Sequence, residues 1–316
     1  MINRSTTFVL GAGAHAPYGF PLGHRLMSNI VASLEGVGQN SWSQQLLCLP
    51  QIVSLRLQPN TLKEFAGALK MAGQLSIDAF LEANGHRRGF AEIGKACIAM
   101  SLMPLEFRSS LFAPSDPNED WLSYLFAEMV SQCANLEAFV KNNHVSFVTF
   151  NYDRSIEHFL TVRLMASFGW PAEVVSEALK AIPIVHVYGS LGPYNYDQAK
   201  PLDTIPLGQL QTAISSLKLI HEADAETHEL NSARSLIQSA EALIILGFGF
   251  HPENVKRIGL VESRRPKTGR LNEATRFGVT GAEWERMRRC MPDIQFETHG
   301  HGSSCKTLLR NTSAWS

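Results

Sequence analysis

Four short apolar stretches predict the buried strands of a parallel sheet. Each is rich in Val, Ile, Leu or Phe and runs into Gly, Asn or His at its C-terminal end, as strands covered on both faces do. They are Thr7–Gly11, Val145–Phe150, Ile182–Tyr188 and Ala242–Gly247, with two weaker strands expected at Arg276–Val279 and Ile294–Glu297.

The segments between these stretches have the three- and four-residue periodicity of helices, as in 120–140. Strands that alternate with helices predict an α/β fold with a doubly wound, parallel, Rossmann-like sheet. In such a sheet ligands bind at the carboxyl ends of the strands, where the strand order reverses. The glycines and polar residues that follow the four stretches are therefore expected to share one crevice.

One region departs from this alternation. Residues Leu22 to Val140 contain four or five helical stretches and no convincing strand, although Pro50–Asn60 is a candidate for a short extended piece. We therefore expect a single domain over 1–316, with a core of about 1–21 and 141–300 and a helical insert of about 22–140. Gly192–Pro206 is expected to form a loop over the strand ends.

Charge excludes some classes of partner. The chain has 28 Lys and Arg against 29 Asp and Glu, a net charge of −1, which provides no electrostatic footprint for nucleic acid or an anionic membrane. The basic run Val261–Arg270 is an exception, and we interpret it as a solvated loop rather than a phosphate-binding patch. The later apolar runs are too short to span a membrane.

Cysteines and the N-terminus bear on metal binding and location. The five cysteines are scattered, with no pair at C-x-x-C spacing, so neither a disulfide framework nor a metal site is expected. The apolar stretch Phe8–Ala14 is too short and glycine-rich for a signal peptide. We therefore expect a cytoplasmic protein.

The first strand is followed by Gly11-Ala12-Gly13. A glycine turn of this kind lets the protein backbone approach a pyrophosphate closely. A dehydrogenase would have a second strand ending in an acid about 20 residues later. Glu35 has roughly that spacing but ends a helical stretch, so a dehydrogenase fits poorly. A tight structural turn is the alternative interpretation.

This loop resembles a known family. Gly11-Ala12-Gly13 followed by Gly19-Phe20-Pro21-Leu22 is similar to the nucleotide loop of sirtuin-like proteins, although His15 stands where many members carry serine. Ser76–Leu81 also resembles a segment of the bacterial sirtuin-like defence proteins. The resemblance implies that Gly11, Ala12, Gly13, Phe20 and Pro21 contact NAD.

The second strand ends in Asn151-Tyr152-Asp153. A carboxamide at a strand end can bind a ribose hydroxyl and a water together. In sirtuins an Asn in a similar motif lies beside the nicotinamide ribose, which implies this role for Asn151 and a place in the site for Asp153. The alternatives are a turn residue for Asn151 and a helix N-cap for Asp153.

The third strand carries His186 and then Tyr188-Gly189-Ser190. The family's catalytic histidine commonly directly precedes this glycine, so Tyr188 is a departure and His186 lies one step back on the same strand face. The resemblance implies that His186 is the base, with Tyr188, Gly189 and Ser190 beside NAD. A buried, hydrogen-bonded histidine is the alternative.

The fourth strand ends in Gly247-Phe248-Gly249, which resembles the family's later glycine turn beside the adenosine half of NAD. A packing glycine is the alternative at Gly247. Four elements in the family's order, each at a predicted strand end, support the resemblance over about Thr7–Pro252.

The resemblance implies an enzyme that hydrolyses the nicotinamide–ribose bond of NAD. Asn151 would orient the ribose and a water, and His186 would accept the proton. The bacterial defence relatives deplete NAD upon phage infection (abortive infection), which implies a trigger through homo-oligomerisation or a partner such as a HerA-like ATPase. The alternatives are a non-catalytic NAD- or ADP-ribose-binding module and a protein deacylase, although the chain lacks the deacylases' paired zinc cysteines.

Overall fold

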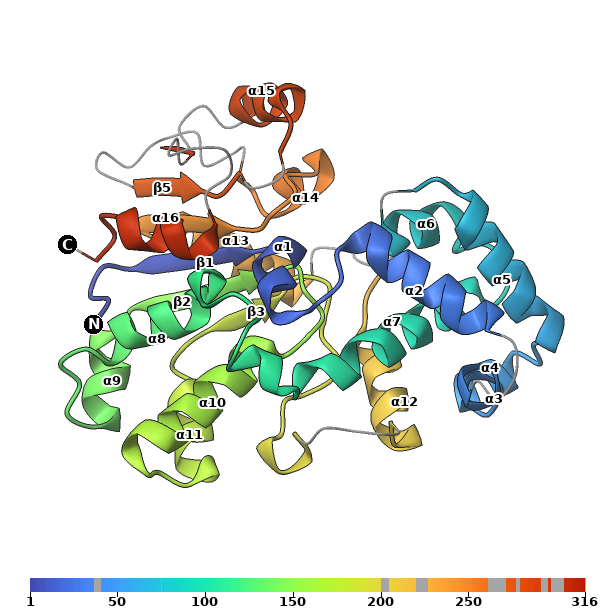
Figure 1. Ribbon diagram of the computed structural model, residues 1–316, viewed down its shortest axis with the longest axis horizontal. Helices are drawn as coiled ribbons and strands as arrows, with labels where there is room; N and C mark the ends of the chain where they lie inside the picture. The colour runs from blue at the N-terminus through green and yellow to red at the C-terminus, as the bar shows by residue number, and fades with distance from the viewer. Residues whose placement is uncertain are drawn as a thin grey trace.

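A computed structural model shows an α/β fold with a parallel sheet flanked by helices (Figure 1). The residues that the structure describes are 1–36, 41–74, 76–199, 205–219, 227–260, 271–276, 279–290, 295–296 and 304–315. The basic run at 261–270 lies outside them, as does the middle of the expected loop at 192–206.

The sheet has the strand order β3-β2-β1-β4-β5-β6, and every neighbouring pair is parallel. This order is that of the dinucleotide-binding sheet, so the structure is compatible with a Rossmann-like fold. The strands are β1 (Thr6–Leu10), β2 (Val145–Thr149), β3 (Ile184–His186), β4 (Ala242–Leu246), β5 (Leu271–Ala274) and β6 (Gln295–Phe296).

The four main predicted strands are confirmed. Burial of β1, β2 and β4 in the middle of the sheet explains their apolar sequences. Every residue of β1, β2 and β4 is buried, as continuous apolar runs require. The third strand is shorter than expected because the amide of Gly189 donates to the carbonyl of His186 (3.1 Å), which turns the chain out of the sheet.

The two weaker strand predictions differ in outcome. The middle of Ile294–Glu297 is strand β6, and its end residues lie outside the described part. In the predicted strand Arg276–Val279 the end residues Arg276 and Val279 are not in a strand, and 277–278 lie outside the described part. The fifth strand is Leu271–Ala274, whose adjacent polar residues Asn272 and Glu273 concealed it. The ladder ends at Thr275, whose hydroxyl accepts a hydrogen bond from the amide of Gly247 (2.8 Å).

Only helices are described between β1 and β2, as predicted for residues 22–140, but they are more numerous than expected. They are α1 (Ala12–His15), α2 (Gly23–Glu35), α3 (Ser41–Leu47), α4 (Pro50–Ser54), α5 (Pro59–Met71), α6 (Ile77–Asn84), α7 (Phe90–Glu106), α8 (Trp121–Val130) and α9 (Leu136–Asn142), with short 3₁₀ turns at Ala16–Tyr18, Ser109–Leu111 and Pro117–Glu119.

Prolines account for one error in this region. The candidate extended piece Pro50–Asn60 forms no strand: residues 55–58 connect α4 to α5, and Pro50 and Pro59 stand in the first turns of these helices, where proline is favoured. The periodic segment 120–140 is two helices rather than one. The break follows Val130, where Gln132 has a left-handed backbone (φ 60°), and the second helix begins after the cap residue Asn135.

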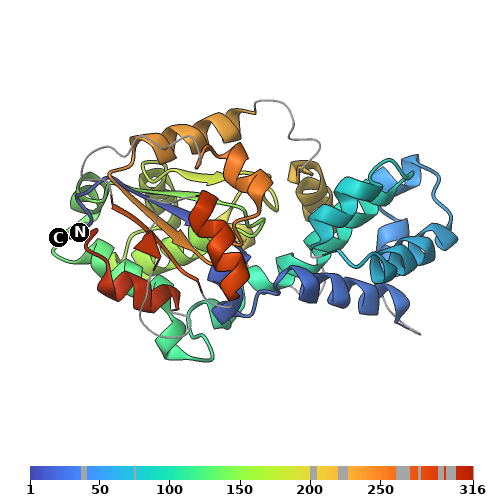
Figure 2. The same ribbon diagram turned by 90° about the horizontal axis from the view of Figure 1, so that it is seen from above.

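The remaining helices are α10 (Ser155–Phe168), α11 (Ala172–Leu179), α12 (Leu207–Ser216), α13 (His228–Ser239), α14 (Pro252–Arg257), α15 (Gly281–Cys290) and α16 (Cys305–Asn311), with a 3₁₀ turn at Tyr196–Gln198. Figure 2 shows α13 on one face of the sheet and α8 and α16 on the other. No helix in the described ranges is both long and apolar enough to cross a membrane.

The helices α2 to α7, joined by α12, gather beyond the carboxyl ends of the strands in both views (Figures 1 and 2). We call this group the helical lobe. Buried side chains of the lobe and of the sheet belong to one continuous hydrophobic core. The lobe therefore lies where ligands bind in sheets of this order.

Candidate functional site

The glycine turns that follow β1 and β4 touch each other through their backbones. The amide of Gly13 donates to the carbonyl of Gly247 (3.0 Å), and a Cβ on Gly247 would lie 1.9 Å from the amide nitrogen of Ala14. Gly11 and Gly247 are thus required by packing, which was the alternative interpretation of both turns. Ala12 remains exposed at the tip of the loop.

Asn151 lies directly against this glycine turn. Its backbone N–H donates to the hydroxyl of Thr149 (3.0 Å), and its side-chain Nδ2 donates to the carbonyl of Gly11 (3.2 Å). The side chain is buried. The structure therefore brings together the tips of β1 and β2, as the sequence predicted.

Asp153 and His15 form a buried pair beside Asn151. The Oδ1 atom of Asp153 lies 2.9 Å from Nδ1 of His15 and accepts from the amide of Ser155 (3.3 Å). Burial tends to raise the pKa of Asp153, but the charge and hydrogen bond of His15 outweigh it and hold this pKa below its usual value. Asp153 thus serves both as a local turn cap and as part of the site.

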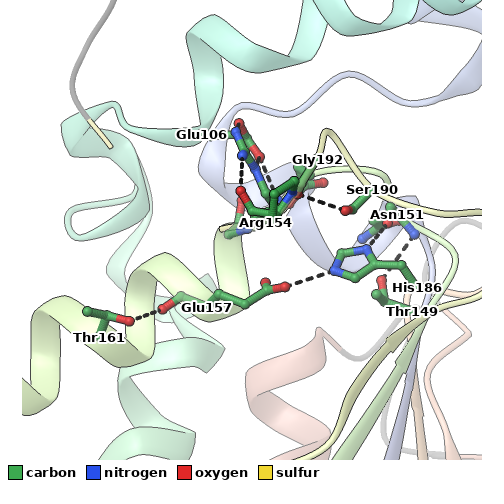
Figure 3. A network of polar contacts seen from close by, with 12 residues as sticks. Glu106, Thr149, Asn151, Arg154, Glu157, Thr161, His186, Ser190 and Gly192 are labelled. Carbon is green, nitrogen blue, oxygen red and sulfur yellow. Dashed lines mark hydrogen bonds and ion pairs between the residues drawn. The ribbon is translucent and has the colours of Figure 1, made fainter. Parts of the chain in front are cut away.

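His186 contacts the main chain of Asn151, not its carboxamide (Figure 3). Its Nδ1 donates to the carbonyl of Asn151 (2.8 Å), and its Nε2 donates to Oε1 of Glu157 on α10 (3.0 Å). Both partners are acceptors, so the ring holds both protons. His186 therefore has no free ring nitrogen that could accept a proton, as its predicted role requires. In this geometry it positions the main chain of Asn151.

The hydrogen bonds of His186 affect stability in a definite pH range. Burial tends to lower the pKa of His186, but the charge and hydrogen bond of Glu157 and the Asn151 carbonyl outweigh it, so the pKa is raised. When folding raises the pKa of a histidine, the protonated ring stabilises the fold. This contribution is fully present below the pKa of the unfolded chain and disappears as the pH rises through the pKa of the folded chain.

We therefore expect Glu157→Gln to lower the free energy of unfolding by about 1.5–3 kcal/mol at pH 6, the range of a charged hydrogen bond. The difference from the unmodified chain should be smaller at pH 9, because the imidazole loses its proton as the pH rises. Urea unfolding at both pH values measures it, with the exposed Glu173→Gln on α11 as control. An equal difference at both pH values would contradict the ion pair.

Two side chains from the helical lobe hold the loop that follows β2. Glu106 at the end of α7 is fully buried and accepts three hydrogen bonds from Arg154: from its amide (2.6 Å), Nε (3.0 Å) and one terminal nitrogen (2.6 Å) (Figure 3). The hydroxyl of Tyr152 donates to Asp78 at the start of α6. The lobe thus fixes the residues on either side of Asp153.

Tyr188, Gly189 and Ser190 follow β3 but do not join the carboxamide of Asn151. The Tyr188 hydroxyl donates to Oδ1 of Asn254 on α14 (2.6 Å), and burial raises its pKa to about 12. A Cβ on Gly189 would lie 2.0 Å from the Ser216 carbonyl oxygen, and Ser190 donates to the carbonyl of Gly192 (3.0 Å).

The other predicted contact residues surround these groups. Phe20 is buried with its ring 5.6 Å from that of His15, and Pro21 is partly exposed. Phe248 packs on Phe150, with ring centroids 4.8 Å apart, whereas Gly249 is exposed. Gly247 and His186 thus contact the residues around Asn151, whereas Tyr188 is held by α14.

Sequence reasoning missed the carboxylates of Glu157 and Glu106 and the role of His15. Glu157 lies four residues after Asp153, and this spacing at the start of a helix was its only signal. Glu106 lies in a distant helix, so no local pattern indicates its pairing with Arg154. His15 was visible only as a departure from the family's serine.

Compared with known proteins, the chain matches no protein-family model and no curated protein. Within the described residues, no cluster of three or more His, Cys, Asp or Glu side chains is placed to hold a metal ion. The function of the chain is therefore inferred from its sequence motifs and from the geometry of the site.

Proposed function

We propose that the chain is an NAD glycohydrolase that cleaves the nicotinamide–ribose bond to give nicotinamide and ADP-ribose. The observation that carries this proposal is the contact of the Asn151 carboxamide with the glycine turn after β1, beside the buried His15–Asp153 pair. In this proposal the chain is one sirtuin-like domain, with a doubly wound core of about 1–21 and 141–300 and a helical insert of about 22–140.

The chemistry of the bond supports the assignment of Asn151. Nicotinamide leaves as a neutral molecule, so the protein has to hold the ribose, exclude bulk water and place one nucleophile. A buried carboxamide can donate to a water and accept from a ribose hydroxyl. Thr149 and His186 hold the main chain of Asn151 from two sides, which keeps that carboxamide in a single position.

A reaction that consumes NAD has to be restrained until it is needed. We propose that the activity depletes NAD in antiphage defence and is triggered by self-assembly or by a partner such as a HerA-like ATPase, as the family resemblance implies. The helical lobe supports this idea because its residues Glu106 and Asp78 contact the loop that carries Asp153. A shift of the lobe would therefore move the site.

A second candidate is a module that binds NAD or ADP-ribose without chemistry. It is favoured by one observation: both ring nitrogens of His186 and the hydroxyl of Tyr188 are engaged within the protein. Such groups position a ligand but do not transfer protons at neutral pH.

Nicotinamide release distinguishes the two. The full chain is incubated with NAD, release is followed by chromatography, and NAD binding is measured by calorimetry. We expect release, reduced about 10²-fold or more in Asn151→Ala, as for loss of a positioning group. The exposed Asn29→Ala on α2 is the matched control. Binding without release would favour the module, and full turnover in Asn151→Ala would contradict the site.

A further inference from the structure

His15 has one ring nitrogen with no hydrogen-bond partner among the described residues. The imidazole is 1% exposed, yet its Nε2 atom makes no hydrogen bond. A buried polar atom without a partner costs free energy, so native proteins rarely keep one without a reason. A group on a bound ligand, or a water that reacts with it, would satisfy this atom.

The surroundings of the other nitrogen determine which tautomer the ring adopts. Asp153 is an acceptor 2.9 Å from Nδ1, so Nδ1 carries the proton and donates it. The nearby Nδ2 of Asn151, 3.3 Å from Nδ1, donates to the Gly11 carbonyl and cannot accept a hydrogen bond, so the carboxylate of Asp153 is the acceptor for the Nδ1 proton. In its neutral form the ring therefore presents a lone pair at Nε2.

The ring is also held rigidly and shielded from bulk water. Trp121 stacks nearly parallel to it, with centroids 6.4 Å apart, and the indole donates to the carbonyl of Ala14 (2.7 Å). Phe20 covers another side, 5.6 Å away. A carboxylate that orients a buried imidazole whose other nitrogen is free is the arrangement that general-base catalysis requires.

We propose that His15, oriented by Asp153, is the proton acceptor of the hydrolysis; this rests on the proposed function. In the step, the oxygen of a water forms a bond to the ribose carbon while the bond from that carbon to nicotinamide breaks. The bonding electron pair leaves with nicotinamide, which becomes neutral. The water's proton passes to Nε2 of His15 while Asn151 holds the ribose, and it is lost to solvent after the products leave.

This assignment accounts for the two histidines of the site. His186 uses both nitrogens to hold the Asn151 main chain and Glu157, whereas His15 uses one and keeps the other free. It also gives a function to the position at which the family's loop commonly has serine. The base would thus stand on the glycine loop after β1 instead of on β3.

The kinetic test compares His15→Gln with the exposed control His24→Gln on α2. We expect His15→Gln to lower kcat for nicotinamide release about 10²- to 10⁴-fold with little change in KM, as for loss of a general base. The unmodified chain should lose activity at acid pH, and the residual activity of His15→Gln should not show this loss. Asp153→Asn, which keeps the imidazole but removes its orienting charge, should also lower kcat, while His24→Gln should not.

A second measurement does not depend on turnover. Two-bond ¹H–¹⁵N spectra of histidine-labelled full chain should show that the neutral form of His15 carries its proton on Nδ1 and leaves Nε2 unprotonated, and its signal should shift when ADP-ribose is added. A neutral form protonated on Nε2, or a signal unmoved by saturating ADP-ribose, would overturn the assignment even if His15→Gln failed to fold.

The outcomes separate this inference from the proposed function. Nicotinamide release by the unmodified chain together with full activity of His15→Gln would overturn the role of His15 and leave the hydrolase standing. No release by the unmodified chain would overturn both.

Discussion

Replacing Glu106 with alanine is expected to lower the free energy of unfolding by about 3–5 kcal/mol, the cost of removing one partner of a buried ion pair. Glu106 is fully buried and its two carboxylate oxygens accept from three nitrogens of Arg154. Without them the guanidinium would stay mostly buried beside the Pro193 carbonyl (3.1 Å), with its counter-charge lost. Urea unfolding followed by circular dichroism measures the change.

The matched control is Glu35→Ala, which removes an exposed ion pair with Lys70 (3.0 Å). Exposed pairs contribute about 0–1 kcal/mol, so this variant should unfold almost as the unmodified chain does. Glu106→Gln should be intermediate, since its amide can still accept a hydrogen bond but carries no charge. A loss below about 1 kcal/mol in Glu106→Ala would show that the pair does not stabilise the fold, since that is the range of exposed pairs.

Continuous apolar patterns made most of the sheet predictable. The strands β1, β2 and β4 are buried on both faces, and their sequences show it directly. The strand at Leu271–Ala274 was missed because it is partly exposed and carries Asn272 and Glu273, which conceal the pattern. Periodicity also failed to predict the break between α8 and α9 at residues 131–135. The apolar positions keep their helical spacing there, but the left-handed backbone of Gln132 ends the helix.

The candidate site was predictable only where local motifs mark it. Asn151 and the glycine turns stand at strand ends, so topology alone brings them together. The state of a histidine depends instead on partners distant in sequence: Asp153 for His15, and Glu157 with the Asn151 carbonyl for His186. No sequence pattern distinguishes an imidazole with a free nitrogen from one with none, so the sequence alone could not rank the two histidines as candidate bases.

Gly247→Ala is expected to destabilise the fold by about 4 kcal/mol or more, because it combines backbone strain with overpacking. Gly247 has a left-handed backbone (φ 58°), and its added Cβ would lie 1.9 Å from the amide nitrogen of Ala14 and 2.3 Å from the carbonyl carbon of Gly13. These atoms are main chain and cannot rotate away. Relief would require β4 to separate from the glycine turn, which would also displace the Gly11 carbonyl that holds Asn151.

Gly249→Ala, two residues later, is the control for this variant. Gly249 is exposed, and a Cβ there would meet no atom within 4 Å, so its melting temperature should be unchanged. The pair also separates packing from ligand binding at this turn. If Gly249→Ala is fully stable but binds NAD more weakly by calorimetry, the exposed tip contacts the nucleotide, whereas Gly247 acts through the backbone contact between the two turns. A Gly247→Ala protein as stable as its control would contradict that contact.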